Sequence, residues 1–276
     1  MTALTLTLRD EPLHRIDLSV LRPDRLAGSS PQDIARLGLS CGNRRMQVGE
    51  LFEIVGRDPQ DLVIRNSCAR LDAIGAGMET GRIRVYGNAG DYLGLGMRGG
   101  SIEVHGDSGH WTAGGMHQGM IHLKGNCGDF AGAAIPGEHR GMRGGTLLIT
   151  GNAGDRTGDR MRRGYILIEG DSGDYCGARM IAGTIAVLGE TGRAVGYGMR
   201  RGTLLLGQTP ASLPATLNDC GEHNLGFLRL LIDSFADLDS RFSQLDTARL
   251  RVRRYMGDLA CDGKGEVLVW VGKEPV

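Results

Sequence analysis

A short alternation of apolar and polar residues recurs along the middle of the chain and is the most regular feature of its sequence. The recurring units begin at Gly81, Gly100, Gly119, Gly145, Gly164, Gly183 and Gly202. Successive units start 19 residues apart, except where seven extra residues lie between Gly132 and Met142. In every unit the third and fifth positions are aliphatic, as in Ile83 and Val85. Because the side chains of a strand alternate between its two faces, each unit predicts a short strand with one buried face.

The segment after each predicted strand is rich in glycine and carries one methionine. Glycines recur three and usually seven residues after the glycine that ends the strand, as at Gly87, Gly90 and Gly94. This spacing predicts tight corners, because glycine adopts positive φ without steric cost. The methionines are Met78, Met97, Met116, Met142, Met161, Met180 and Met199. We expect them to pack one above another in a thin core and not to bind a metal.

A single unit cannot bury its apolar face alone, so successive units are expected to stack with their strands side by side. The predicted fold is all-β: a right-handed parallel β-helix (solenoid) of about eight 19-residue coils, counting degenerate copies at 62–80 and 51–56. Its hand follows from the general preference for right-handed crossovers. The expected divisions are a small N-terminal cap over 1–56, the β-helix over 57–210, and a C-terminal helix and strand over 211–276.

The two flanks carry other patterns. Ser30 followed by Pro31 is a typical helix start, and this helix is expected to end by Gly38. From Leu228 to Leu245 apolar residues recur at three- and four-residue steps, which predicts an amphipathic helix. That helix would lie on the apolar face of the chain's own β-helix or dock on a partner. Residues 265–271 predict a final strand, whose free edge would need a cover.

Composition and charge narrow the function classes. The 32 basic residues balance 32 acidic ones, so no net field attracts nucleic acid or an anionic membrane. The first residues lack the basic and apolar regions of a secretion signal, and no apolar run is long enough to cross a membrane. The six cysteines are scattered without a C-x-x-C pair, which favours reduced thiols. A cytoplasmic protein is therefore expected.

No group of residues in the sequence forms a recognisable catalytic centre. The seven histidines lack the spacings of a metal site, and no serine stands in a G-x-S-x-G turn. The segment from Gly94 to Gly99 matches G-x-G-x-x-G, but a predicted strand follows it where a dinucleotide site needs a helix. We expect this chain to be non-catalytic, with no cofactor and no metal site of its own.

One surface feature stands out because the repeat places it in register. The positions after the methionines carry Arg98, Arg143, Arg162, Arg163, Arg200 and Arg201. Stacking would turn them into a basic ladder that binds an extended polyanion, such as a polyglutamate chain, or an acidic partner surface. Another corner collects Asp91, Asp129, Asp155 and Asp174. The alternative is that the two ladders neutralise each other at the surface.

The tandem G-x-x-G-x-x-x-G units, the LFEIVG segment at 51–56 and the LTLTL segment at 4–8 carry a resemblance to a known family. The chain resembles the C subunit of formylmethanofuran dehydrogenase and, more closely, of the formyltransferase/hydrolase complex of aerobic one-carbon-oxidising bacteria. The repeat is shared with the C-terminal domain of the large subunit of glutamate synthase. The resemblance covers nearly the whole chain, and it implies a β-helical scaffold subunit.

The resemblance also implies that the chemistry resides on other chains, with the A, B and D subunits as partners. An amidohydrolase-like A subunit would hydrolyse a formyl-methanofuran-type conjugate to formate, and a D subunit would exchange formyl with tetrahydromethanopterin. Any hydrolase metal, tungsten or molybdenum would belong to those partners. Alternatives are the C subunit of a tungsten or molybdenum formylmethanofuran dehydrogenase, a glutamate-synthase-like spacer domain, or a solenoid acyltransferase. An Arg-rich, Lys-poor composition favours the bacterial complex.

Overall fold

The computed structural model describes residues 2–246 and 250–271, which form two sheets and a few short helices. In spatial order, the larger sheet contains β15 (Asn218–His223), β16 (Val252–Gly257), β17 (Gly265–Trp270), β14 (Thr203–Leu206), β13 (Thr184–Val187), β12 (Arg163–Ile168), β11 (Arg143–Ile149), β10 (Met120–Leu123), β9 (Ser101–His105), β8 (Arg82–Gly87), β6 (Asp58–Ser67), β1 (Ala3–Leu8) and β5 (Phe52–Val55). The smaller sheet contains β4 (Arg44–Gln47), β3 (Gly38–Cys41), β2 (Ile16–Asp17) and β7 (Leu71–Asp72). The helices are α1 (Pro23–Leu26), α2 (Pro31–Ala35), α3 (Val48–Leu51), α4 (Gly226–Asp233) and the 3-10 turns η1 (Arg241–Gln244) and η3 (Leu259–Cys261).

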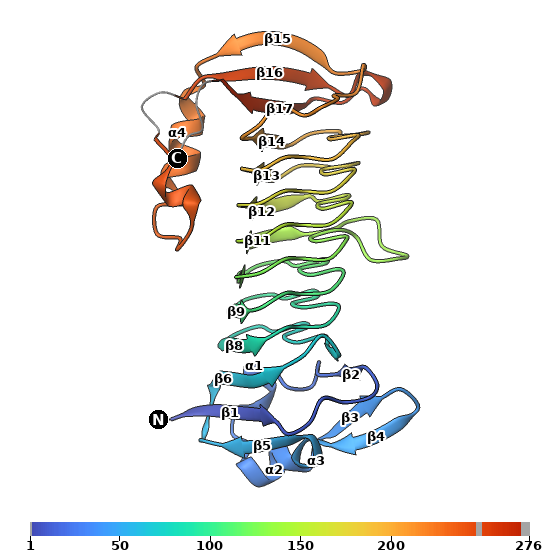
Figure 1. Ribbon diagram of the computed structural model, residues 1–276, viewed down its shortest axis with the longest axis vertical. Coiled ribbons are helices and arrows are strands. Elements are labelled where there is room, and N and C mark those ends of the chain that lie inside the picture. Colours follow the sequence, from blue (N-terminus) through green and yellow to red (C-terminus); the bar gives the residue numbers. More distant parts are fainter. Residues whose placement is uncertain (1, 247–249, 272–276) are drawn as a thin grey trace.

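The central strands stack in the register that the repeat predicts. Ile83 lies beside Ile102, and Ile102 lies beside Ile121, so equivalent aliphatic positions of successive repeats are neighbours. The repeat methionines are fully buried along the same axis, as the sequence predicts. Figure 1 shows the result: the strands lie one above another along the long axis, with the glycine-rich turns gathered on one side. The inner faces of all these strands build one continuous core.

The prediction of an all-β, right-handed parallel β-helix of about eight coils is wrong. The strands form a 13-stranded mixed sheet, mostly parallel, that does not close on itself, and short α-helices accompany it. Opposite the sheet, the pairing of successive repeats is reduced to single-residue bridges, such as Ser108 with Cys127 and Ser172 with Thr191, and to separate backbone hydrogen bonds between turns. The residues around those bridges form turns, many at positive φ, and such backbone cannot continue a strand ladder. Reversals of the chain at both ends add antiparallel strands, which make the sheet mixed.

The N-terminal segment confirms one local prediction and corrects another. Ser30 caps α2: its hydroxyl accepts the backbone N–H of Asp33, and the Asp33 carboxylate accepts the N–H of Ser30. This reciprocal pair satisfies two donors that a helix start leaves open. The 51–56 segment is not a degenerate repeat, because Phe52–Val55 forms β5, which runs antiparallel to β1.

The C-terminal segment departs from the sequence prediction in two ways. The expected helix from Leu228 to Leu245 is broken into α4 and η1, separated by turns. We call residues 226–246, which contain both, the covering segment. Its buried side chains pack on the outer face of the sheet, so it lies on this chain itself. The final strand β17 has no free edge, because it lies between β14 and β16.

Candidate anion-binding groove

Arginines of several repeats converge on a groove on the turn side of the molecule. The groove has a volume of about 720 Å³. Two arginines of the predicted ladder, Arg162 and Arg200, line it. Arg140, Arg160, Arg179 and His139 line it as well, together with Ile181, Gly198 and Cys261. No carboxylate stands among the described residues that line the groove, so five guanidinium groups dominate the charge of its walls. Such a site favours anions, because arginine stays charged at every physiological pH and binds carboxylates or phosphates through paired N–H groups.

The other four predicted arginines lie outside this groove. Arg98 forms an exposed ion pair with Glu79 at 3.7 Å, and Arg143 forms one with Glu138 at 3.5 Å. Arg163 and Arg201 are exposed and are not among the residues that line the groove. The structure therefore brings together two of the six predicted residues. The stacking of the repeats brings Arg162 and Arg200 to the same groove, and Ile181 occupies the equivalent position in the repeat between them.

Arg160 and Arg179 were missed by the sequence analysis, although the repeat contains a signal for them. Both precede a repeat methionine and have positive φ, 58° and 52°. At the equivalent position four other repeats have glycine, at Gly77, Gly96, Gly115 and Gly198, all with positive φ. A side chain in this left-handed conformation costs about 1–2 kcal/mol per residue. Arginine at this strained position, in two successive repeats, makes both residues candidates for a functional role.

Asp159 fixes one of these arginines. Its buried carboxylate accepts the Arg179 Nε–H at 2.9 Å and also pairs with the Nη2 group of the same guanidinium. This pair raises the pKa of Arg179, mainly through the hydrogen bond to the carboxylate. The side chain is thus held in one orientation beside the groove. Among the residues that the structure describes, the Arg160 side chain has one long polar contact, from Nη1 to the carbonyl oxygen of Glu138 at 3.5 Å.

The acidic ladder does not neutralise the basic one. The Asp91 carboxylate accepts the backbone N–H of His110 at 2.9 Å, and Asp155 accepts that of Asp174 at 2.8 Å. Each such side chain thus binds the backbone of the next repeat. The complete series of acceptors is Asp72, Asp91, His110, Asp129, Asp155 and Asp174. Among the residues that the structure describes, no ion pair joins this ladder to the six predicted arginines, because Asp91 pairs with Arg15 and Asp174 with Arg193.

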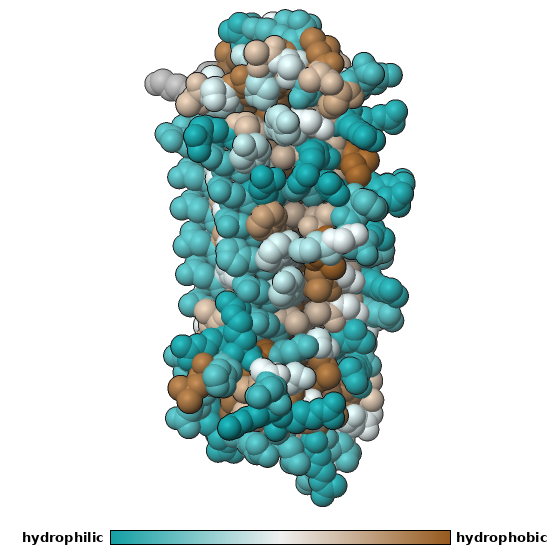
Figure 2. Space-filling view, turned by 90° about the vertical axis from the view of Figure 1, so that its right-hand side faces the viewer, coloured by the Kyte–Doolittle hydropathy of each residue, from teal (hydrophilic) through white to brown (hydrophobic). Residues whose placement is uncertain are grey.

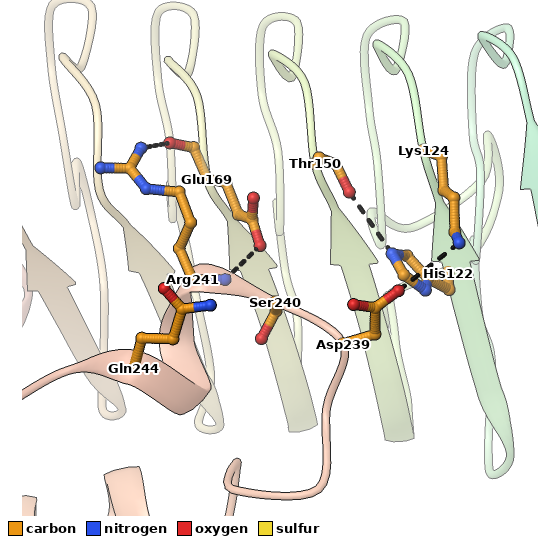
Figure 3. A pocket seen from close by; sticks show the side chains of 8 residues that line it. All are labelled: His122, Lys124, Thr150, Glu169, Asp239, Ser240, Arg241 and Gln244. Atoms are coloured by element: carbon orange, nitrogen blue, oxygen red, sulfur yellow. Dashed lines mark hydrogen bonds and ion pairs between the residues drawn. The ribbon is translucent and has the colours of Figure 1, made fainter. Parts of the chain in front are cut away.

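A second polar hollow, of about 440 Å³, lies on the opposite side, between the sheet and the covering segment (Figure 3). Lys124 from the sheet pairs with Asp239 at 3.5 Å, and the backbone N–H of Arg241 donates to Glu169 at 2.7 Å. Burial raises the pKa of Glu169, and burial also lowers the pKa of His122, whose Nε2 lies 3.3 Å from the Thr150 hydroxyl. These contacts hold the part of the covering segment around Asp239 and Arg241 on the sheet. We interpret this hollow as an attachment point.

The described part of the chain also bears on the predictions about metals and membranes. Within residues 2–246 and 250–271, no three His, Cys, Asp or Glu side chains are grouped so that they could hold a metal ion. In the same ranges no helix has the length and apolarity to span a membrane.

Comparison with known proteins identifies the family. The profile of the GXGXG motif family matches residues 65–220. The C subunit of the formyltransferase/hydrolase complex from Methylorubrum extorquens is 43% identical over 86 residues, which is 31% of this chain and 32% of that protein. The C subunit of the tungsten-containing formylmethanofuran dehydrogenase 2 from Methanococcus maripaludis is 33% identical over 94 residues, 33% of this chain and 35% of that protein. These alignments span about a third of the length of the curated relatives.

A solved structure matches over a much longer range. One chain in the crystal structure of the formyltransferase/hydrolase complex from Methylorubrum extorquens, determined with methylofuran, superposes with a TM-score of 0.91. It is 41% identical, and the match covers 97% of this chain and 100% of that one. The chain therefore belongs to the GXGXG motif family, and its relatives within that family are the C subunits of formyltransferase/hydrolase and formylmethanofuran dehydrogenase complexes.

Proposed function

We propose that this chain is the C subunit of a formyltransferase/hydrolase complex and serves as its structural subunit. The observation that carries this proposal is the likeness to a chain of such a complex over 97% of the sequence at 41% identity. In this assembly, the A, B and D subunits are its partners, and formyl passes between tetrahydromethanopterin and a methanofuran-type carrier before formate is released. The catalytic steps and their metal belong to the partner subunits.

The architecture suits a structural role. The buried methionines and the hydrogen bonds between repeats fix each repeat on the one before it, which makes the body a stiff rod. Side chains at equivalent positions then form straight rows on the surface, and such rows can meet other subunits over a long distance. An amphipathic covering segment closes the apolar part of the outer face, so the remaining surface is free for partners.

The groove has a role in the same proposal. Arg140, Arg162 and Arg200 would hold the carboxylates of an extended carrier arm, such as polyglutamate, while the carrier's formyl group moves between active sites on other subunits. Successive guanidinium groups suit an extended chain of carboxylates better than a single compact anion, because Arg162 and Arg200 stand in different repeats.

The assembly is tested by producing this chain together with the A, B and D subunits and measuring the mass of the purified product by native mass spectrometry. We expect one hetero-oligomer that contains all four chains and has formyltransferase and hydrolase activity, while this chain alone has neither. A chain that stays apart from the other three, or that catalyses either reaction alone, would refute the proposal.

The groove is tested separately with polyglutamate as the probe. The double variant Arg162→Glu/Arg200→Glu should bind polyglutamate at least ten times more weakly than the wild type, by calorimetry at low salt. Arg163→Glu/Arg201→Glu is the matched control, because it makes the same change of charge outside the groove. Equal losses in the two double variants would show a general charge effect and would remove the groove from the proposal.

A formylmethanofuran dehydrogenase is the second candidate, favoured by the match to the C subunit of the tungsten-containing enzyme at 33% identity. The higher identity to the formyltransferase/hydrolase protein, 43% by sequence, places it second. Metal analysis of the purified complex separates the two, since only the dehydrogenase would contain stoichiometric tungsten or molybdenum.

A further inference from the structure

Beside the arginine groove lies a smaller hollow that the proposed function does not use. Its volume is about 270 Å³, and it is bounded by the seven-residue insertion on one side and by aromatic rings on the other. Arg160 and Arg179 line both this hollow and the groove. Figure 2 shows the face that carries the turns, where apolar side chains gather in the middle between hydrophilic margins.

The aromatic wall is a stack built by three successive repeats. The rings of Tyr92 and Trp111 lie 5.6 Å apart between centroids, and those of Trp111 and Phe130 lie 4.7 Å apart, nearly parallel. All three residues have positive φ and are only partly buried. Trp111 and Phe130 both line the hollow and give it an aromatic wall. Aromatic rings pair favourably with other rings, either offset-stacked or edge to face.

The opposite wall is the one departure from the 19-residue period. Ile135 and Pro136 of the insertion line the hollow with apolar surface. The insertion is held in place by backbone hydrogen bonds, from Ala134 N–H to the Asp159 carbonyl and from Gly141 N–H to the Arg160 carbonyl. The stacking of the repeats does not need these residues, since the ladder continues across them from Asp129 to Asp155 at 2.9 Å. An ordered insertion that the stacking does not require points to a role in recognition.

The rim carries two arginines, Arg160 and Arg179, and two carboxylates, Glu138 and Asp159. Asp159 is already paired with Arg179, and Glu138 forms its ion pair with Arg143. Within the described ranges, the Arg160 guanidinium has one polar contact, the carbonyl oxygen of Glu138, so it is available to a carboxylate from outside this chain. The rim is therefore complementary to a carboxylate next to whatever group enters the hollow.

We propose that this hollow is a docking site for a segment of a partner protein chain, which inserts one aromatic or large aliphatic side chain and places a carboxylate on Arg160. Tryptophan and arginine are among the residues that most often dominate binding at protein interfaces, and both line this hollow. Pockets for complete small ligands are usually about 300–1,000 Å³, so a hollow of this size fits a single side chain better. The inference rests on the proposed function, which supplies the A, B and D subunits as the partners to test.

The test uses the complex of the four chains and the fluorescence of Trp111. This chain contains two tryptophans, and the other, Trp270, is buried. Mixing the wild-type chain with the A, B and D subunits should shift the emission of Trp111 as its environment changes. Trp111→Ala and, separately, Ile135→Asp should weaken assembly at least 30-fold, as expected of a residue at the centre of an interface.

Two controls keep the outcomes distinct. Tyr92→Ala removes a ring of the same stack that does not line the hollow, so it reports the cost of disturbing the stack alone. Ile135→Asp lies in the insertion, outside the repeat strands, and circular dichroism will show whether its fold is intact. If the wild-type chains do not assemble, the proposed function fails. The docking site is overturned if the wild-type chains assemble without a change in Trp111 emission and both hollow variants bind as tightly as Tyr92→Ala.

Discussion

The outer face of the large sheet divides into two halves that share one inner core. In β8–β10 the outward positions are polar, with Arg84, Glu103 and His122 in one row. From β11 onward the same row is apolar and buried, as at Leu148 and Leu167. The inner positions are aliphatic in both halves. The repeat therefore fixes which residues stand on the inner face. On the outer face the residue type differs between the two halves.

The turn of the covering segment at Asp239 lies where this change occurs. Phe235, Phe242 and Leu228 pack against the apolar half, and Asp239 reaches across the boundary to Lys124. Lys124 also forms an ion pair with Glu103 at 3.0 Å, so this one side chain links the charged half to the covering segment. The polar half needs no apolar cover, because its side chains are polar and form ion pairs, such as Arg84 with Asp61 and Lys124 with Glu103.

The largest effect is expected from Phe242→Ala, which tests whether the covered half depends on its cover. Phe242 is fully buried between the covering segment and the sheet. The substitution should lower the free energy of unfolding by about 3–5 kcal/mol, measured by urea denaturation. Phe227→Ala is the control, because Phe227 is 44% exposed on the same segment and should cost much less. Similar losses in both variants would contradict a specific packing role for Phe242.

A smaller effect is expected from Lys124→Met, which cuts the link across the boundary. Its ion pairs with Glu103 and Asp239 are partly exposed, so the loss should stay below about 1 kcal/mol. Amide hydrogen exchange at residues 236–244 should nevertheless become faster, because this part of the covering segment loses its anchor. Unchanged exchange there would mean that packing alone holds the segment.

The smallest effect is expected from Glu169→Gln and depends on pH. Burial raises the pKa of Glu169, so its contribution to stability is complete below the ordinary glutamate pKa and is lost as the pH rises through the raised value. Glutamine can still accept the Arg241 N–H, but it does not titrate. The melting temperature of the variant should therefore rise relative to that of the wild type as the pH increases from acidic to neutral. A constant difference between the two across that range would contradict this assignment.

The strand register, the buried methionines and the Ser30 cap followed from the sequence because each depends on neighbouring residues or on a strict period. Closure of the sheet did not follow, since it depends on whether the turn side forms ladders, and glycine-rich turns there form single bridges. The broken C-terminal helix was missed because periodicity gave too little weight to Asp237, Asp239 and Ser240, which favour turns over helix interiors. The expected divisions at residues 56 and 210 stay a prediction.

Two of the five arginines in the candidate groove could be predicted from the sequence. The period alone identified Arg162 and Arg200, whereas Arg140 lies in the insertion, outside any repeat position. Arg160 and Arg179 could have been found by asking which repeats replace the left-handed glycine with a larger residue. The change on the outer face was also visible in the sequence, because Leu148, Leu167 and Leu205 stand where earlier repeats have charged residues.

The hydrogen bonds from ladder side chains to the backbone of the next repeat depend on where the two repeats lie in space. They do not depend on the number of residues between the two partners. Asp129 accepts the N–H of Asp155 across 26 residues at 2.9 Å, much as Asp155 accepts that of Asp174 across 19 residues at 2.8 Å. The stretch from 133 to 141 could therefore be lengthened without loss of stacking, although the residues that it contributes to the groove and the hollow would be displaced. A fluorescent reporter or a whole foreign domain could be spliced there, and the repeats above and below would still find one another.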